Sequence, residues 1–216
     1  KGAIHMYYIE LHIHSSRGSL DSLLDIEDLV NECKRIGING VCITEHIEWR
    51  MLSLEEYSNL YSCCKMQKNT VDFFPGAEVK LQNGYEYLVI GVEIPIEWFS
   101  MRWDEAVSKI HQIGGIVIKS HPYRDENVVI PYDGVELYNF CSNDSMNELT
   151  KEYVRKHPNM IYTCGSDAHS ADVVGMAITA LPHKPSSGVE LARMIRNKEI
   201  SYYILEGLEY KKDDLI

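Results

Sequence analysis

Five of the nine histidines in this chain of 216 residues stand in short polar groups that also carry carboxylates. The members of these groups are His12, His14, Asp21, Glu45, His46, Glu78, His121, Asp167 and His169. Imidazole nitrogens and carboxylate oxygens without thiolates suit Zn, Mn or Fe better than a structural cysteine site. Taken singly, each histidine also fits a surface or hydrogen-bonded structural role. The recurrence of the pattern is what indicates a metal centre.

The first group has the spacing of a metal-binding pair on a strand. Residues 6–14 alternate, so that Ile9 and Leu11 face one way while His12 and His14 face the other. Two such side chains start from α carbons about 7 Å apart, which is close enough to share one ion. We therefore expect a strand that delivers two imidazoles to one surface at its C-terminal end.

The polar groups follow predicted strands that alternate with predicted helices. Strands are expected over 6–14, 41–44, 71–79, 85–92, 116–119, 134–138, 160–164 and 202–205. Helices are expected over 26–36, 54–69, 103–113, 143–156 and 188–197. Repeated βα units predict a mainly parallel sheet, open or closed into a barrel. In both architectures the carboxyl ends of the strands build the site.

The order of the motifs resembles the PHP domain, named for polymerases and histidinol phosphatases. The resemblance runs from Tyr8 to about Thr179 and rests on Leu11-His12-Ile13-His14-Ser15, Asp21-Ser22, Ile43-Thr44-Glu45-His46, Gly76-Ala77-Glu78, Ser120-His121-Pro122 and Gly165-Ser166-Asp167-Ala168-His169. It implies an α/β fold, a distorted (β/α)7 TIM-like barrel in a single domain over 6–216. It also implies two or three divalent metal ions (Zn, Mn or Fe) and phosphoester hydrolysis by a metal-bound, metal-bridging hydroxide.

The resemblance also implies a ligand for each ion. One metal takes His12, His14, Glu78 and Asp167, a second takes Asp21, His46 and His169, and a third shares Glu78 and takes His121. Many members have a further histidine in the stretch that is here Gly84-Tyr85-Glu86-Tyr87. Glu86 offers an oxygen in its place, and the alternatives are a weak third site or none.

A phosphate ester also needs a cationic clamp, for which a guanidinium fork is well matched. Arg17 follows His14, and Arg124 lies three residues past His121, so both are candidate phosphate-binding residues. A surface ion pair is the alternative role for either arginine. The sequence identifies no general acid, and His183 is expected to be a solvated loop residue.

Composition narrows the class of partner. Asp and Glu number 32 against 21 Lys and Arg, the formal net charge is −11, and no basic run occurs. A long nucleic acid is therefore not expected, whereas a small phosphorylated substrate or a short nucleotide is compatible with bound cations. No apolar segment is long enough for a membrane span, and the sequence shows no cationic leader followed by an apolar region, so we expect a cytoplasmic protein. Residues 1–5 resemble the remnant of a cloning junction, and the six cysteines are expected to be reduced.

The sequence thus predicts a metal-dependent phosphoesterase acting on a small phosphorylated metabolite or an (oligo)nucleotide. Histidinol-phosphate phosphatase is an alternative, which the modest chain length disfavours, and an exonuclease is another, which the acidic charge disfavours. A non-catalytic module that binds metal or nucleotide is an alternative of a different class. The last alternative is an amidohydrolase-like enzyme, in which Lys80 or Lys119 is the candidate carbamylated lysine. The substrate, the native metal and the oligomeric state are not indicated.

Overall fold

Short strands and five helices alternate along the computed structural model, which describes residues 6–65, 70–124, 129–206 and 209–212. The strands are β1 (Tyr7–Glu10), β2 (Gly40–Ile43), β3 (His46–Glu48), β4 (Asp72–Lys80), β5 (Glu86–Ile90), β6 (Ile116–Lys119), β7 (Gly134–Asn139), β8 (Ile161–Gly165), β9 (Ala177–Leu181), β10 (Ser201–Glu206) and β11 (Glu209–Lys212). The helices are α1 (Ile26–Ile36), α2 (Leu54–Leu60), α3 (Trp103–Gln112), α4 (Asp144–Lys156) and α5 (Gly188–Arg196). The residues with a predicted cloning origin, 1–5, lie outside the described residues.

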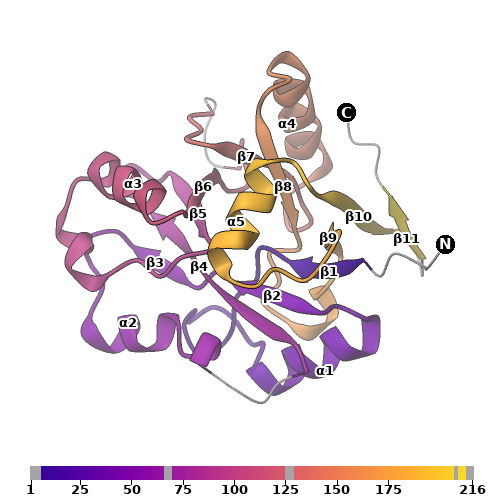
Figure 1. Ribbon diagram of the computed structural model, residues 1–216, viewed down its shortest axis with the longest axis horizontal. Helices are drawn as coiled ribbons and strands as arrows, with labels where there is room; N and C mark the ends of the chain where they lie inside the picture. Colours follow the sequence, from indigo (N-terminus) through magenta and orange to yellow (C-terminus); the bar gives the residue numbers. More distant parts are fainter. Residues whose placement is uncertain (1–5, 66–69, 125–128, 207–208, 213–216) are drawn as a thin grey trace.

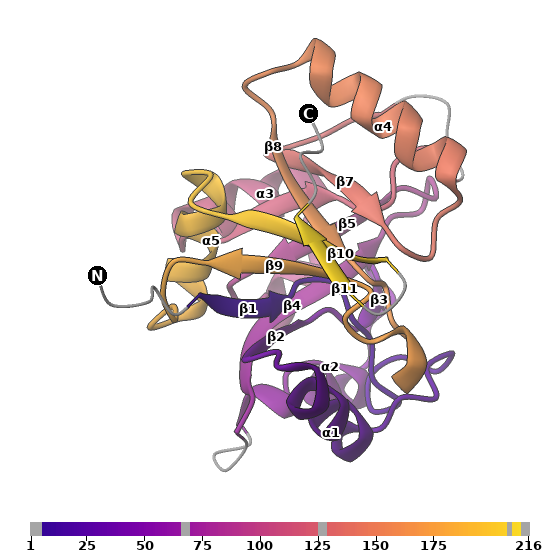
Figure 2. The same cartoon turned by 90° about the vertical axis from the view of Figure 1, so that its right-hand side faces the viewer.

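The strands join in one curled sheet, in the order β11-β10-β9-β1-β2-β4-β5-β6-β7-β8, with β3 paired to β4 beside this path (Figures 1 and 2). The chain beyond β1 meets the chain beyond β8. There the His14 N–H donates to the Ala168 carbonyl at 3.0 Å, and the Asp167 N–H donates to the His12 carbonyl at 2.9 Å. These bonds nearly close the sheet into a distorted barrel, which confirms the predicted α/β barrel class.

The prediction of a mainly parallel sheet is wrong. Strand β5 runs antiparallel to both β4 and β6, and β9 runs antiparallel to β1 and β10. The physical reason at β5 is the short turn before it, residues 81–85, in which the Leu81 N–H donates to the Tyr85 carbonyl. A parallel connection needs a crossover of about a dozen residues or more, and this turn has no room for one.

The barrel interior is filled by apolar side chains from strands all round the sheet, together with one face of α5. Leu191, Met194 and Ile195 of α5 are fully buried in this cluster against Ile9 of β1 and Ile118 of β6. Other clusters pack α1, α3 and α4 on the outside of the sheet. Figure 1 shows α5 crossing the sheet while the other helices surround it. The apolar interior leaves the opposite end of the barrel for polar groups.

Some predicted elements differ in length from the observed ones. Helix α2 begins at a capping box of Ser53 and Glu56 and ends at Leu60, before a 3-10 turn over Cys63–Lys65, whereas a helix over 54–69 is predicted. Residues 66–69 of that prediction lie outside the described residues. The helix stops early because Tyr61 and Cys63 turn into the core. Strands β3, β9 and β11 are not predicted at all.

Two predictions from composition can also be compared with the structure. All six cysteines are free, as expected for reduced residues. Within the described part of the chain, no helix has both the length and the apolar character needed to cross a membrane.

Candidate metal centre

The polar residues singled out in the sequence converge on one end of the barrel because of strand direction. Strands β1, β2, β4, β6, β7 and β8 all point the same way, since the two antiparallel pairings at β5 cancel. His12, His14, His121, Asp167 and His169 all follow the carboxyl ends of such strands. Strand β5 runs the other way, so its first residue, Glu86, lies at the same end.

Four fully or almost fully buried side chains form the floor of the site, here called the inner group: His12, His14, Glu78 and Asp167. Nε2 of His12 lies 3.4 Å from both Glu78 Oε2 and Asp167 Oδ1. Nε2 of His14 lies 3.4 Å and 3.2 Å from the same two oxygens. A tetrahedron with ligands about 2.0–2.1 Å from its centre has edges of about 3.3–3.4 Å, so these spacings fit one four-coordinate cation.

The polar atoms of the inner group that face one another have no hydrogen bond. Nε2 of His12, Nε2 of His14 and Oε2 of Glu78 are buried without such a partner within the described residues. Buried polar atoms are normally satisfied, and three convergent exceptions require an explanation. The outer nitrogens, in contrast, are held: Nδ1 of His12 lies 2.8 Å from Glu136 Oε1, and Nδ1 of His14 lies 3.3 Å from Ser19 Oγ. The arrangement leaves the inner lone pairs available to a metal ion.

A second group continues from the inner group toward solvent, here called the outer group: His14, His46, His169 and Asp21. The donor atoms of the three histidines lie within 4.8 Å of one another, and the rings of His46 and His169 stack on that of His14. Oδ2 of Asp21 lies 3.4 Å from His46 Nε2 and 3.7 Å from His169 Nε2. Asp21 is 64% exposed, so this group opens to solvent.

A third group, here called the outlying group, consists of Glu78, Glu86 and His121. Nε2 of His121 lies 2.8 Å from Glu78 Oε1 and 3.4 Å from Glu86 Oε2. Glu78 thus presents one oxygen to the outlying group and the other to the inner group. A carboxylate with two oxygens can serve two cations at once.

Three of the four side chains in the inner group are in the charge state that binds a cation. Burial opposes ionisation of Glu78 and Asp167, but His12 and the neighbouring histidines outweigh it and hold both carboxyl pKa values well below the ordinary range. Burial lowers the pKa of His14 to about 3. Burial also disfavours the charged form of His12, yet Glu136, Asp167 and Glu78 raise its pKa well above the usual value. At neutral pH the carboxylates are ionised and His14 is neutral, which are the ligand forms.

Two residues of the site have backbone conformations that L-residues rarely adopt. His121 has φ of 26° and Asp167 has φ of 57°. Such conformations cost about 1–3 kcal/mol each and persist where the surrounding structure enforces them. Here the two conformations direct the side chain of His121 into the outlying group and that of Asp167 into the inner group.

The residues of the three groups lie within a region of this chain that is similar to a known protein family. The sequence model of the PHP domain matches residues 10–206, a span that holds every member of the three groups. The chain belongs to the PHP domain family. The resemblance predicted from the motif order is therefore confirmed.

Several known proteins are similar to this chain in sequence or in fold. A probable histidinol-phosphatase of Thermotoga maritima is 28% identical, over 92% of this chain and 96% of the relative. A two-domain protein of Bacteroides vulgatus, containing a predicted PHP-like metal-dependent phosphoesterase, superposes with a TM-score of 0.68 at 15% identity, over 93% of this chain and 65% of its own. A lesion-specific endonuclease of Pyrococcus furiosus superposes with a TM-score of 0.62 at 16% identity, over 89% of this chain. This chain spans only 56% of the endonuclease.

Two residues that hold the PHP site together, Glu136 and Asn139, are not predicted from the sequence. Glu136 of β7 accepts from His12 Nδ1, from the His121 N–H at 2.8 Å and from Asn139 Nδ2 at 3.0 Å. Asn139 Nδ2 also lies 3.2 Å from Asp167 Oδ2. Glu136 stands inside an apolar strand, and no local pattern marks it.

Glu45, in contrast, belongs to none of the three groups. It is buried and accepts from the Ser15 N–H at 3.0 Å and from the Ser19 hydroxyl at 2.7 Å. Both serines lie in the loop that follows His14. Glu45 therefore holds that loop against the start of β3, which is the loop-orienting role considered for it in the sequence.

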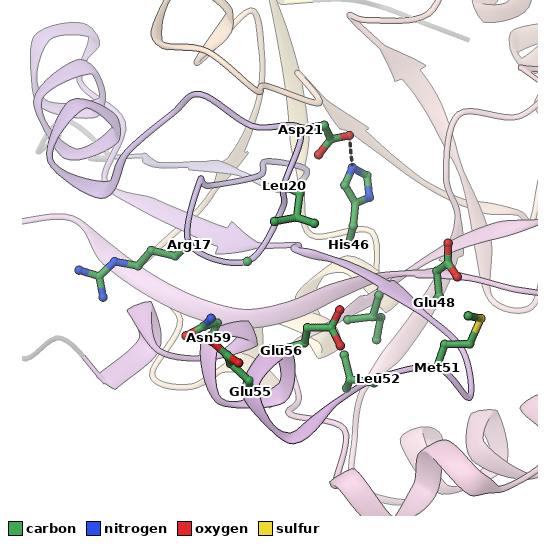
Figure 3. Close-up of a pocket in the computed structure, with 12 residues that line it drawn as sticks. Arg17, Leu20, Asp21, His46, Glu48, Met51, Leu52, Glu55, Glu56 and Asn59 are labelled. Atoms are coloured by element: carbon green, nitrogen blue, oxygen red, sulfur yellow. Dashed lines mark ion pairs between the residues drawn. The ribbon is translucent and has the colours of Figure 1, made fainter.

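The two candidate phosphate-binding arginines differ in position. Nη2 of Arg124 lies 2.8 Å from Asp167 Oδ2 and 3.1 Å from Asn139 Oδ1, so its guanidinium borders the inner group. Arg17 lines a pocket beside the outer group, and Figure 3 shows its guanidinium pointing away from His46 and Asp21. The phosphate role of both arginines stays a prediction.

The remaining candidates lie around the edge of the site. His183 is exposed on a loop and contacts the Lys184 carbonyl, as expected of a solvated residue. Nζ of Lys80 lies 3.2 Å from Glu86 Oε1. Lys119 is buried, and its ammonium group donates to the Ser120 carbonyl and lies over the rings of Tyr85 and Tyr87. Neither lysine belongs to the inner group, where the amidohydrolase alternative needs one.

Proposed function

We propose that this PHP domain is a metal-dependent phosphoesterase that hydrolyses a small phosphate monoester. The observation that carries the proposal is the inner group, whose four donor atoms have spacings that fit one tetrahedral cation and three of which are buried without a hydrogen bond among the described residues. His12, His14, Glu78 and Asp167 would hold one ion, and His46, His169 and Asp21 would hold a second. When bound, such ions supply Lewis acidity toward a phosphoryl oxygen and lower the pKa of water.

The chain itself contributes orientation and a place for the phosphoryl group. Glu136 and Ser19 hold the outer nitrogens of His12 and His14, so that both Nε2 lone pairs face the same point. Within the described residues, the hydrogen bonds of the Arg124 guanidinium come from Nη2. Its remaining N–H groups can donate to a phosphate oxygen and neutralise charge that develops during ester cleavage.

A pocket of about 650 Å³ begins at Asp21 and His46 and is suited to the organic part of the ester (Figure 3). Its wall is partly apolar, with Leu20, Met51 and Leu52. Its charged residues are mostly carboxylates, namely Asp21, Glu48, Glu55 and Glu56, against the single cation Arg17. A negative wall disfavours a polyanion, which supports a small monoester over an oligonucleotide.

Histidinol phosphate is the second candidate substrate, because the Thermotoga maritima relative is named a probable histidinol-phosphatase. That match covers 96% of the relative, so the modest length of this chain does not disfavour the assignment. The amine of histidinol phosphate also suits a pocket lined with carboxylates. The single domain over 6–216 and the cytoplasmic location remain predictions.

The test is phosphate release by protein that is stripped with a chelator and then refilled with Mn²⁺, Zn²⁺ or Fe²⁺. Histidinol phosphate, other small monoesters, mononucleotides and short oligonucleotides form the substrate panel. We expect metal-dependent release from monoesters that is lost in Asp167→Asn and retained in Asp28→Asn, an exposed aspartate of α1. If folded protein retained metal but released no phosphate from any ester, the proposal would be overturned in favour of a regulatory module.

A further inference from the structure

One buried hydroxyl, that of Ser19, connects Glu45 to histidines of the inner and the outer group. Oγ of Ser19 lies 2.7 Å from Glu45 Oε2, and the His46 N–H donates to it at 3.0 Å. Its third neighbour is Nδ1 of His14, at 3.3 Å. Ser19, Glu45 and His14 are all buried. Through a single side chain, Glu45 is thus connected to the histidine that the inner and outer groups share.

The single proton of the Ser19 hydroxyl is donated to Glu45. The N–H and the hydroxyl of Ser15 also donate to the Glu45 carboxylate, so its hydrogen-bond partners among the described residues are all donors, which favours the ionised form. An ionised carboxylate only accepts, so Ser19 must donate to it. The two lone pairs of the Ser19 oxygen then accept from the His46 N–H and from His14. His14 is therefore a donor, with its proton on Nδ1.

The position of this proton decides whether His14 can bind a cation. In a neutral imidazole one nitrogen carries the proton and the other carries a lone pair. With the proton on Nδ1, the lone pair is on Nε2, which faces Glu78 and Asp167 and has no hydrogen bond within the described residues. The opposite tautomer would donate from Nε2 to Asp167 Oδ1, 3.2 Å away. A proton would then fill the place of the cation.

We infer that Glu45 is a positioning residue for the metal centre, which acts through the Ser19 hydroxyl to keep the proton of His14 on Nδ1. This role goes beyond holding the loop after His14, because it depends on the direction of the hydrogen bonds as well as on the position of the loop. The inference rests on the metal-binding role proposed for His14. The tautomer itself can be measured without any metal.

The experiment measures the tautomer of His14 by ¹⁵N NMR in the chelator-stripped full chain at neutral pH, with His14→Gln to assign the signals. Wild-type protein should show a protonated Nδ1 and an unprotonated Nε2. Ser19→Ala should shift the proton toward Nε2 and bind Zn²⁺ about 10–100-fold more weakly, as expected when the support of a metal ligand is lost. Ser15→Ala is the matched control, because it removes another hydroxyl partner of Glu45 in the same loop. It should keep the tautomer and the Zn²⁺ affinity of wild-type protein.

Two substitutions of Glu45 test the carboxylate itself. In Glu45→Gln the amide oxygen must take the position of Oε2, because the Ser15 N–H that donates there cannot turn away. The amide NH₂ group then faces the Ser15 hydroxyl, which can accept from it. This variant keeps an acceptor for Ser19 and should retain the proton on Nδ1 of His14. Glu45→Leu removes the acceptor and should shift the tautomer as Ser19→Ala does.

Thermal unfolding should establish that each variant is folded before measurement. A proton on Nε2 of His14 in wild-type protein, or a proton that stays on Nδ1 in Ser19→Ala and Glu45→Leu, would overturn the inference and leave metal binding intact. An equal shift of the tautomer in Ser15→Ala would also overturn it, because loop position would then be the cause. Wild-type protein that binds no Zn²⁺ would overturn the proposed function and, with it, the positioning role.

Discussion

Oε1 of Glu136 lies 2.8 Å from Nδ1 of His12, on the side of the imidazole opposite the Nε2 that faces Glu78 and Asp167. Burial raises the pKa of Glu136, but His12 outweighs this effect and keeps that pKa below its usual value, so the carboxylate is ionised and can only accept. Nδ1 of His12 must therefore carry the proton. In the neutral imidazole, this contact fixes the tautomer whose Nε2 lone pair faces the inner group.

Replacement of Glu136 by Gln should weaken metal binding. The three partners of Glu136 all donate: His12 Nδ1, the His121 N–H and Asn139 Nδ2. A buried amide has one acceptor oxygen, so its NH₂ group must face a donor. We expect a 10–100-fold loss of metal affinity, of the order seen when such supporting residues are changed. Competition against a chromogenic chelator measures it, with Glu148→Gln as an exposed control. Unchanged affinity would mean that Glu136 does not position His12.

Gly165 lets β8 approach β1 closely enough to build the inner group. A Cβ atom at this position would lie 2.4 Å from Cβ of His12 and 2.8 Å from Glu136 Oε1. Gly165→Ala should therefore displace His12, destabilise the fold by roughly 1–3 kcal/mol and weaken metal binding. Chemical denaturation and metal titration measure the two effects.

Gly134→Ala is the matched control for that substitution. Its Cβ would lie 2.2 Å from the Ile161 carbonyl oxygen, in the first residue pair of the β7–β8 ladder, away from the site. It should cost similar stability without a change in metal affinity of the folded protein. Equal losses of affinity in both variants would attribute the effect to general instability rather than to His12.

Much of the site could be predicted from the sequence because its members occur in short motifs at strand ends. The alternation through His12 and His14 defines their common face, and Gly165 to His169 follows a recognisable strand. The structure brings the four side chains of the inner group together because β1 and β8 meet where the barrel nearly closes. Local pattern and strand direction are sufficient for such residues.

Other features depend on contacts between distant parts of the chain. Glu136 and His12 are 124 residues apart, and the apolar sequence around Glu136 resembles any buried strand. The position of Glu86 depends on β5 reversing direction after a short turn, which the βα alternation does not predict. Sequence periodicity reports which face of an element is buried, but it does not report which partner lies opposite.

Arg124 should be the stronger phosphate ligand of the two candidate arginines. Its guanidinium borders Asp167, whereas that of Arg17 points away from the outer group (Figure 3). Arg124→Lys keeps a positive charge near Asp167 but loses the fork, so we expect about tenfold weaker inhibition by inorganic phosphate, with metal content unchanged. Arg17→Lys should change inhibition less than about threefold, and Arg50→Lys, an exposed control, should not change it. If Arg17→Lys weakened inhibition by phosphate more than Arg124→Lys did, the phosphate clamp would be assigned to Arg17.

Metal removal should lower stability because the inner group gathers carboxylates that lose their counter-charge. Glu78 and Asp167 are both ionised and buried, and His12 is the main positive charge between them. A metal at about 100 times its Kd should stabilise the fold by about 2.7 kcal/mol, provided that it binds the folded chain alone. For a chain of this length that corresponds to a rise in Tm of about 5–10 °C. Differential scanning calorimetry with and without Mn²⁺ or Zn²⁺ measures the shift. Asp167→Asn should be folded and should show little metal-dependent rise in Tm. A full rise in Tm in that variant would place the stabilising ion outside the inner group.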